Sequence, residues 1–339
     1  MQSTADRTRH IEGVLYAVGA YSIWGFLFPV WLVWGNRMVG PASSTPGWSL
    51  ELLAQRVVWA VVVCLMLVAC RRQFRDLAGL LRRPKLVATL VLTTALVTVN
   101  WVAFIYGTAT GRLSHASLGY YLNPLLSVAL GVAFLGERIR PVQIAAILVA
   151  ALGVLYQVFA LGVVPWIALV VAITFGLYGL IRKRIGVGPV VGLTVETALV
   201  TPIALAYTIW AAIAQPEIAG GPARFASGAG VTTILVGAGV LTALPLLWFA
   251  AAASRLRLTT VGLMQYIAPT GQLFVALLLN GEPLTPDHAV VFGLIWAGVA
   301  LFAWDSLRAA KHARPAQATD TAETCTSIPQ KPERKAEPT

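Results

Sequence analysis

The sequence predicts an all-α membrane protein with ten transmembrane helices arranged as two inverted repeats of five. Three observations lead to this fold class: the composition, a series of long apolar stretches and an internal duplication. Of the 339 residues, 58% are hydrophobic and only 12% are charged, and the mean hydropathy is +0.75. A water-soluble domain carries about 25% charged residues. The chain therefore has too little polar surface to coat a soluble globule of its length.

The apolar stretches are long enough to cross a bilayer, because a helix needs about 20 residues to span the hydrocarbon core. A transmembrane β-barrel would show short alternating segments instead, so the continuous runs argue against it. The first stretch lacks a small-residue cleavage site and is interpreted as a retained helix rather than a signal peptide. The ten predicted helices cover residues 12–34, 50–69, 85–107, 114–135, 141–158, 164–181, 190–213, 231–253, 259–279 and 286–307.

The internal duplication joins two segments that lie 145 positions apart. Residues 113–141 read LSHASLGYYLNPLLSVALGVAFLGERIRP, and residues 258–286 read LTTVGLMQYIAPTGQLFVALLLNGEPLTP. In this gap-free register Pro124 aligns with Pro269 and Glu137 with Glu282. Five predicted helices separate the starts of the copies, so the second copy is inverted in the membrane. The two predicted repeats cover residues 11–158 and 163–307, and inverted repeats are typical of carriers with two alternately open faces.

The distribution of basic residues gives the orientation. With a cytoplasmic N-terminus, 21 of the 25 lysines and arginines lie in inner segments, three lie in outer loops and one, Arg56, lies within a span. The positive-inside rule therefore predicts that both termini are cytoplasmic. The net charge of +11 is explained by these loops, so no nucleic-acid partner is expected. Residues 308–339 lack an apolar period and are predicted to form a disordered cytoplasmic tail.

Two charged side chains fall within predicted spans, where ionisable groups are costly and are functional candidates by default. Arg56 lies on the order of 9 Å from the outer end of its span and Glu196 at a similar depth from the inner end. At these depths we expect no direct ion pair between them. Arg56 could attract an anionic group, and Glu196 could carry a coupling proton. Alternatively, Arg56 extends to the outer headgroups and Glu196 pairs with a loop cation such as Arg182 or Lys183.

Polar and aromatic side chains also gather near the predicted midplane. Amides and phenols beside indole rings suit a moderately polar, partly aromatic organic solute, because they orient it without the cost of bare charge. Alternatively, the aromatic residues anchor the helices at the interface and the amides join neighbouring helices. Asn100, Tyr120 and Gln265 are the preferred pore-lining candidates. The wider set is Trp24, Asn100, Trp101, Tyr120, Tyr121, Asn123, Gln265 and Tyr266.

Prolines within the predicted spans mark candidate hinges. Pro124, Pro245 and Pro269 each remove a backbone hydrogen bond, which kinks a helix unless neighbouring groups satisfy the freed carbonyl. Static kinks are the alternative reading. Glu137 and Glu282 each follow a glycine at the end of a span and are interpreted as structural residues at helix ends.

The sequence contains none of the common motifs of metal sites or catalytic centres. His115 and His288 have no cysteine or carboxylate at metal-ligand spacing, and the three cysteines show no metal or disulfide pattern. There is no Walker lysine motif and no nucleophile elbow. The sequence therefore predicts no catalytic residue, no metal and no cofactor.

Several motifs, long ones among them, resemble the RarD permeases of the EamA group in the drug/metabolite transporter superfamily. The resemblance covers residues 11–307 and is carried by the stretch from Tyr16 to Gly25, QRVVW at 55–59, Asn100-Trp101, SLGYYLNPL at 117–125, LGER at 135–138, YGLIRKRI at 178–185, Glu196-Thr197, TALPLLWFAAAASRLRLTTVG at 242–262 and QYIAPT at 265–270. It implies two inverted EamA repeats, a bacterial inner-membrane location and a family label of chloramphenicol resistance or sensitivity. One departure is Gln55, where the family pattern has histidine; a titrating role there would pass to Glu196. Another is the long extension at 39–49.

The leading hypothesis is a secondary transporter that moves a small organic metabolite or drug outward by alternating access. The expected partners are a small-molecule substrate and the lipid bilayer, and a homodimer remains open. One alternative is an intramembrane enzyme, but the clustered His, Asp or Ser residues that it needs are missing from the spans. The other is a structural or sensory membrane protein without transport activity.

Overall fold

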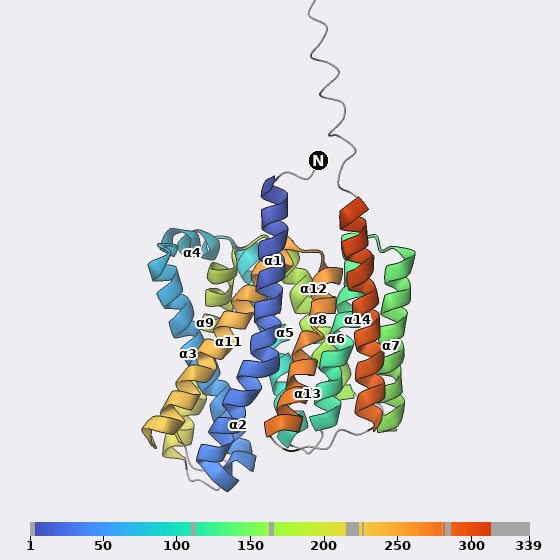
Figure 1. Cartoon of the computed structure of the whole chain (residues 1–339). Helices are drawn as coiled ribbons and strands as arrows, with labels where there is room; N and C mark the ends of the chain where they lie inside the picture. Colours follow the sequence, from blue (N-terminus) through green and yellow to red (C-terminus); the bar gives the residue numbers. More distant parts are fainter. Residues whose placement is uncertain are drawn as a thin grey trace, which may run out of the picture.

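The computed structural model describes residues 4–109, 113–162, 166–214, 224–225, 227–279, 281 and 286–312. These residues form a bundle of long helices that run between two ends of the molecule (Figure 1). The elements are α1 (Thr4–Ser22), η1 (Ile23–Leu27), α2 (Phe28–Val39), η2 (Gly40–Ser44), α3 (Pro46–Cys70), α4 (Phe74–Leu81), α5 (Pro84–Ala109), α6 (Leu113–Leu135), α7 (Pro141–Leu161), α8 (Trp166–Arg184), α9 (Pro189–Ile213), α11 (Ala229–Arg255), α12 (Leu258–Met264), α13 (Ile267–Leu279) and α14 (Pro286–His312).

Within the described ranges, nine helical segments are long and apolar enough to cross a membrane, and α6 contributes a shorter apolar stretch, Gly119–Leu135. The outer surface of the bundle is apolar as well: Phe159, Ile213 and Leu278 are 77–80% exposed. Such exposure would be costly in water and suits contact with lipid tails. The predicted all-helical membrane fold is thereby confirmed.

The first span is longer than predicted and contains a π-helical turn. It runs from Thr8 to Val39, with η1 between α1 and α2. Pro29 follows at the start of α2 and has no backbone N–H to donate to the turn before it. A π-helical turn is one way in which a helix accommodates a missing bond of this kind, and such turns are frequent at functional sites.

The ninth predicted span is interrupted rather than continuous. A turn at Gln265 and Tyr266 separates α12 from α13. Pro269 is the third residue of α13, where a missing N–H costs little because the first helical turn has no partner for it. The aligned Pro124 instead lies inside the uninterrupted α6. Pro245 also lies inside a continuous helix, α11.

One short helix was not predicted. The helix α4 has eight residues and carries Leu80, which packs against Leu90 of α5 and Val191 of α9. A search for membrane-spanning stretches cannot detect a helix of this length. At the other end of the chain, α14 extends to His312, five residues beyond the predicted helix. The remainder of the predicted tail, residues 313–339, lies outside the described residues.

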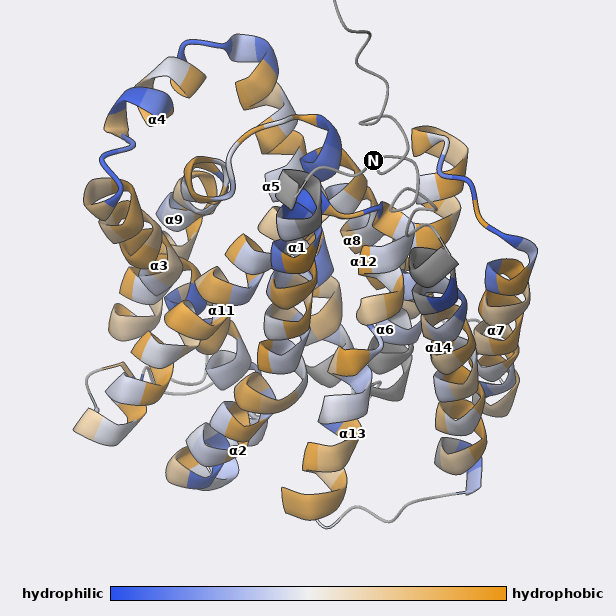
Figure 2. Cartoon of the chain, turned by 45° about the horizontal axis from the view of Figure 1, so that its top comes forward, coloured by the Kyte–Doolittle hydropathy of each residue, from blue (hydrophilic) through white to orange (hydrophobic). Residues whose placement is uncertain are grey.

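Basic side chains gather at one end of the bundle, which we call the basic face. It is formed by α4 and its flanking residues, by the last turn of α8 with Arg182, Lys183 and Arg184, and by the connections at residues 136–140 and 256–257. The chain enters α1 and leaves α14 at this end (Figure 1). In Figure 2, hydrophilic residues lie in and beside α4 and in the connection that leads into α7. At the opposite end lies the extension at 39–49, in which Thr45 caps α3 by accepting a hydrogen bond from the Trp48 N–H at 3.4 Å.

Candidate functional site

A cavity of about 250 Å³ lies inside the bundle and brings together residues from both halves of the sequence. Seven of the ten side chains singled out from the sequence line it, namely Trp24, Arg56, Asn100, Trp101, Tyr120, Asn123 and Gln265. The other lining residues include Phe28, Phe104, Phe175, Thr242 and Gln272. Aromatic rings therefore form much of the wall, and the polar groups are few.

The cavity lies toward the end opposite the basic face. Phe28 begins α2, the part of the first span that is remote from the basic face, and Arg56 and Tyr120 fall in the halves of α3 and α6 that are remote from it. Its Gln265 lies at the break between α12 and α13, and Trp24 lies in the π-helical turn. Both irregular turns of the backbone therefore border the cavity.

Among the described residues that line the cavity, Arg56 alone carries a formal charge. Its Nε donates to Thr242 Oγ1 at 2.8 Å, and Thr242 Oγ1 in turn donates to the Ala238 carbonyl at 2.7 Å. The guanidinium carbon lies 4.7 Å from the ring centroid of Phe28 and 5.5 Å from that of Trp101. Arg56 thus points into the cavity and does not extend to the headgroups, which was the alternative interpretation.

The amides of the cavity also connect helices. Asn100 Nδ2 donates to the Val171 carbonyl at 2.8 Å and to Thr174 Oγ1 at 3.2 Å, which joins α5 to α8. Gln265 Oε1 accepts from Ser127 Oγ at 3.2 Å, which joins the helix break to α6. Asn100 and Gln265 therefore combine the two predicted roles, lining the cavity and holding neighbouring helices together.

Five aromatic side chains, which we call the aromatic layer, separate the cavity from the basic face. They come from α1, η1, α8 and α11, and α8 and α11 both end at the basic face. Ring centroids of neighbouring members lie 5.1–6.4 Å apart. The members are Tyr21, Trp24, Phe175, Tyr178 and Phe249.

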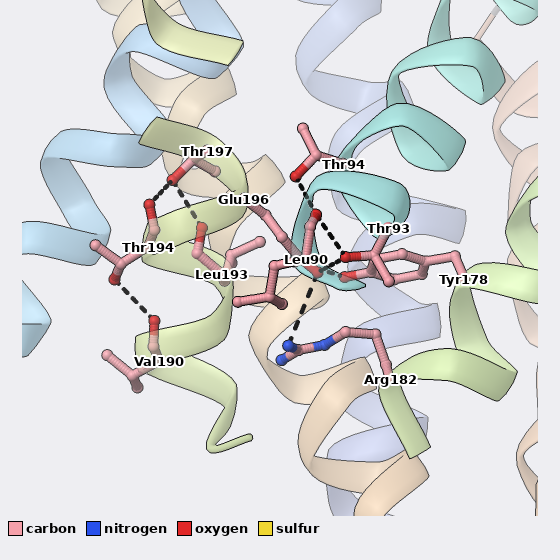
Figure 3. A network of polar contacts seen from close by, with 10 residues as sticks. All are labelled: Leu90, Thr93, Thr94, Tyr178, Arg182, Val190, Leu193, Thr194, Glu196 and Thr197. Carbon is pink, nitrogen blue, oxygen red and sulfur yellow. Dashed lines mark hydrogen bonds and ion pairs between the residues drawn. The ribbon is translucent and has the colours of Figure 1, made fainter. Parts of the chain in front are cut away.

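Glu196 lies outside the cavity, in a buried polar network (Figure 3). Its carboxylate accepts hydrogen bonds from Thr93 Oγ1 at 2.6 Å and from the Tyr178 hydroxyl at 3.3 Å, and Arg182 NH1 lies 3.8 Å away. The side chains of Arg182 and Glu196 are only 1% and 2% exposed. Glu196 therefore pairs with Arg182, as the alternative interpretation held. It does not pair with Arg56, in agreement with the expectation from their depths in the membrane.

A small void of about 10 Å³ links this network to the cavity. It is lined by Glu196 and Tyr178, and it shares Trp101 and Leu246 with the larger cavity. A void of this size holds about one water molecule. Glu196 and the cavity are thus separated only by a thin wall of side chains.

Arg182 was interpreted from the sequence as a loop cation, but it belongs to the last turns of α8. Its i, i+4 spacing from Tyr178 puts both side chains on one helix face, and that was the signal in the sequence. Gly192 makes room for it, because a Cβ there would lie 2.1 Å from Arg182 NH1. Within the described part of the chain, the Nε and NH1 of Arg182 lack hydrogen-bond partners.

Tyr121 and Tyr266 face away from the cavity. The ring of Tyr121 packs edge-on against Phe292, 5.6 Å between centroids. Tyr266 is buried in a cluster with Val128 and Val291. Gln55, at the position of the family histidine, is also buried outside the cavity and accepts a hydrogen bond from Trp59 Nε1 at 3.1 Å.

Glu137 has a structural role at the basic face. Its carboxylate accepts hydrogen bonds from the N–H groups of Leu258 and Thr259 at 2.6 and 2.9 Å, which caps the N-terminus of α12. Its aligned partner Glu282 and the side chains of His115 and His288 lie outside the described residues. Among the residues described, no three His, Cys, Asp or Glu side chains come together as a metal site would require.

Comparison with known proteins identifies the family. Residues 11–159 match the EamA-like transporter family. An "Uncharacterized transporter" of Vibrio cholerae is 39% identical over 94% of this chain and 100% of its own length. The chain belongs to the EamA-like transporter family. Among its EamA relatives, the protein RarD of Salmonella typhimurium is 38% identical over 89% of this chain and 97% of its own length.

Other EamA relatives extend the comparison. The "Chloramphenicol-sensitive protein RarD" of Pseudomonas aeruginosa is 31% identical over 77% of this chain and 86% of its own. A crystal structure that shares 18% sequence identity superposes with a TM-score of 0.61 over 88% of this chain and 99% of that one, which supports the fold. This EamA protein is therefore a multi-pass membrane transporter with bacterial relatives.

Proposed function

We propose that this EamA transporter is a secondary carrier that moves a small organic solute across the bacterial inner membrane by alternating access, in the outward direction. The observation that carries the proposal is the cavity between the two halves. Pockets for drug-sized ligands typically measure roughly 300–1,000 Å³. At about 250 Å³ the cavity suits a compact solute, with rings to pack against its body and a few polar groups to orient it.

The packing of the helices supports two inverted repeats. In the 145-residue register, α5 corresponds to α11 and α7 to α14. By chain order α1 corresponds to α8 and α3 to α9, with Trp24 opposite Phe175 and Gln55 opposite Glu196. Under this exchange the contact of α1 with α11 becomes that of α8 with α5, and both contacts exist. The pairs α3–α9 and α7–α14 map onto themselves, and both pairs are also in contact. This is the pattern expected of a pseudo-twofold axis in the membrane plane.

Residues on both sides of that axis meet in the cavity. Tyr120 aligns with Gln265, Trp24 aligns with Phe175, and all four side chains line the cavity. Groups close to the axis can stay in contact with a solute when the open side changes. The mismatch between an aromatic residue in one half and an amide in the other gives such a site two chemically different walls.

The basic face is the cytoplasmic side in this proposal, because basic connections remain inside. Both termini are then cytoplasmic, and the cavity belongs to an outward-facing arrangement. The aromatic layer forms the closed inner gate. Entry of a solute from the cytoplasm into the cavity would require Tyr21, Tyr178 and Phe249 to separate.

Glu196 is the candidate for proton coupling, with a facilitator mode as the alternative. It is an ionisable group on the inner side of the gate, one thin wall away from the cavity. Glu196→Gln keeps the shape and removes the charge. We expect transport in Glu196→Gln to lose its dependence on pH, and an unchanged pH dependence would rule out Glu196 as the coupling residue.

Two other functions are less well supported. The hydroxyl groups that line the described cavity belong to Tyr21, Tyr120 and Thr242, and no His, Asp or Glu lines it that could activate them as nucleophiles of an intramembrane enzyme. A structural or sensory protein would not need a polar cavity between two halves. Assembly as a homodimer remains a prediction.

The test begins with purified full-length protein in detergent. A ligand that binds the folded state raises its apparent stability, so a thermal-shift screen over metabolites and amphenicols, including chloramphenicol, should find a binder. Flux of that binder into proteoliposomes should then follow. If no solute that binds is moved across the membrane, transport through this cavity is refuted.

A further inference from the structure

Arg56 has no counter-ion among the residues that the structure describes. Ion pairs among the described residues join Arg140 to Asp305, Arg182 to Glu196, Lys183 to Glu137 and Arg255 to Glu12, and Arg56 is in none of them. A charged side chain within the membrane is costly and is normally paired. The carboxylate that would complete this site is therefore missing from the described part of the chain.

The guanidinium of Arg56 is held in one orientation. Its Nε is bonded to Thr242, and its flat face lies near the rings of Phe28 and Trp101. Cation–π contacts of this kind stabilise the guanidinium without using its terminal N–H groups. Those groups have no hydrogen-bond partner among the described residues, and Arg56 lines the cavity.

A fixed guanidinium with free terminal N–H groups matches a carboxylate, which it binds through two parallel hydrogen bonds. The other cavity-lining residues are uncharged, so one negative charge on a solute balances the site and a second would remain unpaired. The aromatic rings of Trp24, Trp101 and Phe104 leave an apolar wall for the rest of the molecule.

We propose that the solute is a compact organic monocarboxylate whose carboxylate pairs with Arg56 and whose apolar or aromatic body packs against Trp24, Trp101 and Phe104. This inference rests on the proposed transport function and gives its substrate class. It explains why the cavity holds a cation that none of the described residues neutralises. The negative charge of the carboxylate also distinguishes the substrate from neutral solutes of the same size and shape.

Matched acid and amide ligands test the charge directly. Thermal shift of the purified full-length protein is measured with phenylacetate against phenylacetamide and with indole-3-acetate against indole-3-acetamide. Each acid should stabilise the protein at least about tenfold more effectively, in ligand concentration, than its amide, because hydrogen bonds to charged groups are the stronger ones. Equal effects of acid and amide would overturn the proposal.

Variants then assign the effect to Arg56. Arg56→Gln should abolish the preference for acids, and Arg56→Lys should retain part of it, because lysine keeps the charge but loses the planar fork. Arg37→Gln is the matched control: Arg37 is an exposed arginine near the same end of the bundle and is not part of the cavity wall. If Arg56→Gln does not fold, Arg56→Lys together with the ligand pairs still decides.

The remaining outcomes separate this inference from the proposed function. Stabilisation by chloride or inorganic phosphate, without any by the organic acids, would show an inorganic anion site and overturn the proposal. Binding and transport of neutral solutes alone would also overturn it and leave the transport function intact. If no solute of either kind is bound or transported, the transport function itself fails.

Discussion

Gly153 of α7 and Gly298 of α14 lie 145 positions apart in the sequence and occupy equivalent places in one helix crossing. A Cβ on Gly153 would lie 3.0 Å from the Val291 carbonyl oxygen, and one on Gly298 would lie 2.5 Å from the Ala146 carbonyl oxygen. Ala146 and Val291 are themselves 145 positions apart. Each helix therefore presents the same surface to the other, as in an isologous interface. This reciprocity supports the inverted repeat.

The first prediction concerns this crossing. Gly298→Ala should destabilise the protein by roughly 1–3 kcal/mol, because an added methyl group in a close helix contact forces the backbones apart. Gly293→Ala on the same helix is the control, since a Cβ at Gly293 would have no neighbouring atom within 4 Å. Thermal unfolding in detergent should show a lower Tm for Gly298→Ala only. Equal Tm values for the two variants would contradict the close packing.

Much of the fold could be predicted because lipid imposes a strong constraint on sequence. Each membrane-spanning helix needs an unbroken apolar run, and Pro141–Leu161 is such a run. The break at Gln265 could not be foreseen, since Pro124 and Pro269 look alike in the sequence and only one of them lies beside an interrupted helix. The difference depends on tertiary packing, which local sequence does not encode.

The second prediction concerns the space beside Arg182. Gly192→Ala should displace the Arg182 side chain from Glu196, because the new Cβ would fall 2.1 Å from its NH1 and 2.8 Å from its Cζ. Gly188→Ala, four residues earlier, is the control, with nothing within 4 Å of the added Cβ. Only Gly192→Ala should change the pH dependence of transport, measured in proteoliposomes. A normal profile for that variant would mean that the Arg182–Glu196 distance does not matter for coupling.

The third prediction concerns the same buried pair. Arg182→Met or Glu196→Gln alone should destabilise the protein by about 3–5 kcal/mol, because each leaves the other group buried without its partner. The double variant should lose much less than the sum of the single variants. Chemical denaturation of all four proteins measures the coupling energy. Additive losses would show that the 3.8 Å pair contributes no interaction of its own.

The candidate site could be predicted in part. Polar residues in apolar spans, such as Asn100 and Gln265, stand out in a sequence because the bilayer selects against them. Arg182 was predicted only as a loop cation that could pair with Glu196, because it follows the apolar part of its span, and its place inside α8 was missed. Thr242 was missed because threonine is common in membrane helices and its role depends on Arg56, 186 positions away. Roles that come from long-range contacts are not visible in local patterns.

The last prediction uses Cys64 as a reporter of the inner gate. Cys64 is fully buried and belongs to the same core cluster as Tyr21, Tyr178 and Phe249 of the aromatic layer. Separation of that layer would expose the thiol toward the basic face, whereas the arrangement described here protects it. In a Cys70→Ser, Cys325→Ser background, a membrane-impermeant maleimide applied from the cytoplasmic side should label Cys64 slowly. A transported solute should change that rate by shifting the population of the two states. The control is a Cys64→Ser, Cys325→Ser variant, in which Cys70 is the single cysteine. The same reagent should label Cys70 rapidly with or without solute, since Cys70 is already exposed. A Cys64 rate that no transported solute changes would argue that the aromatic layer is a fixed part of the core and not a gate.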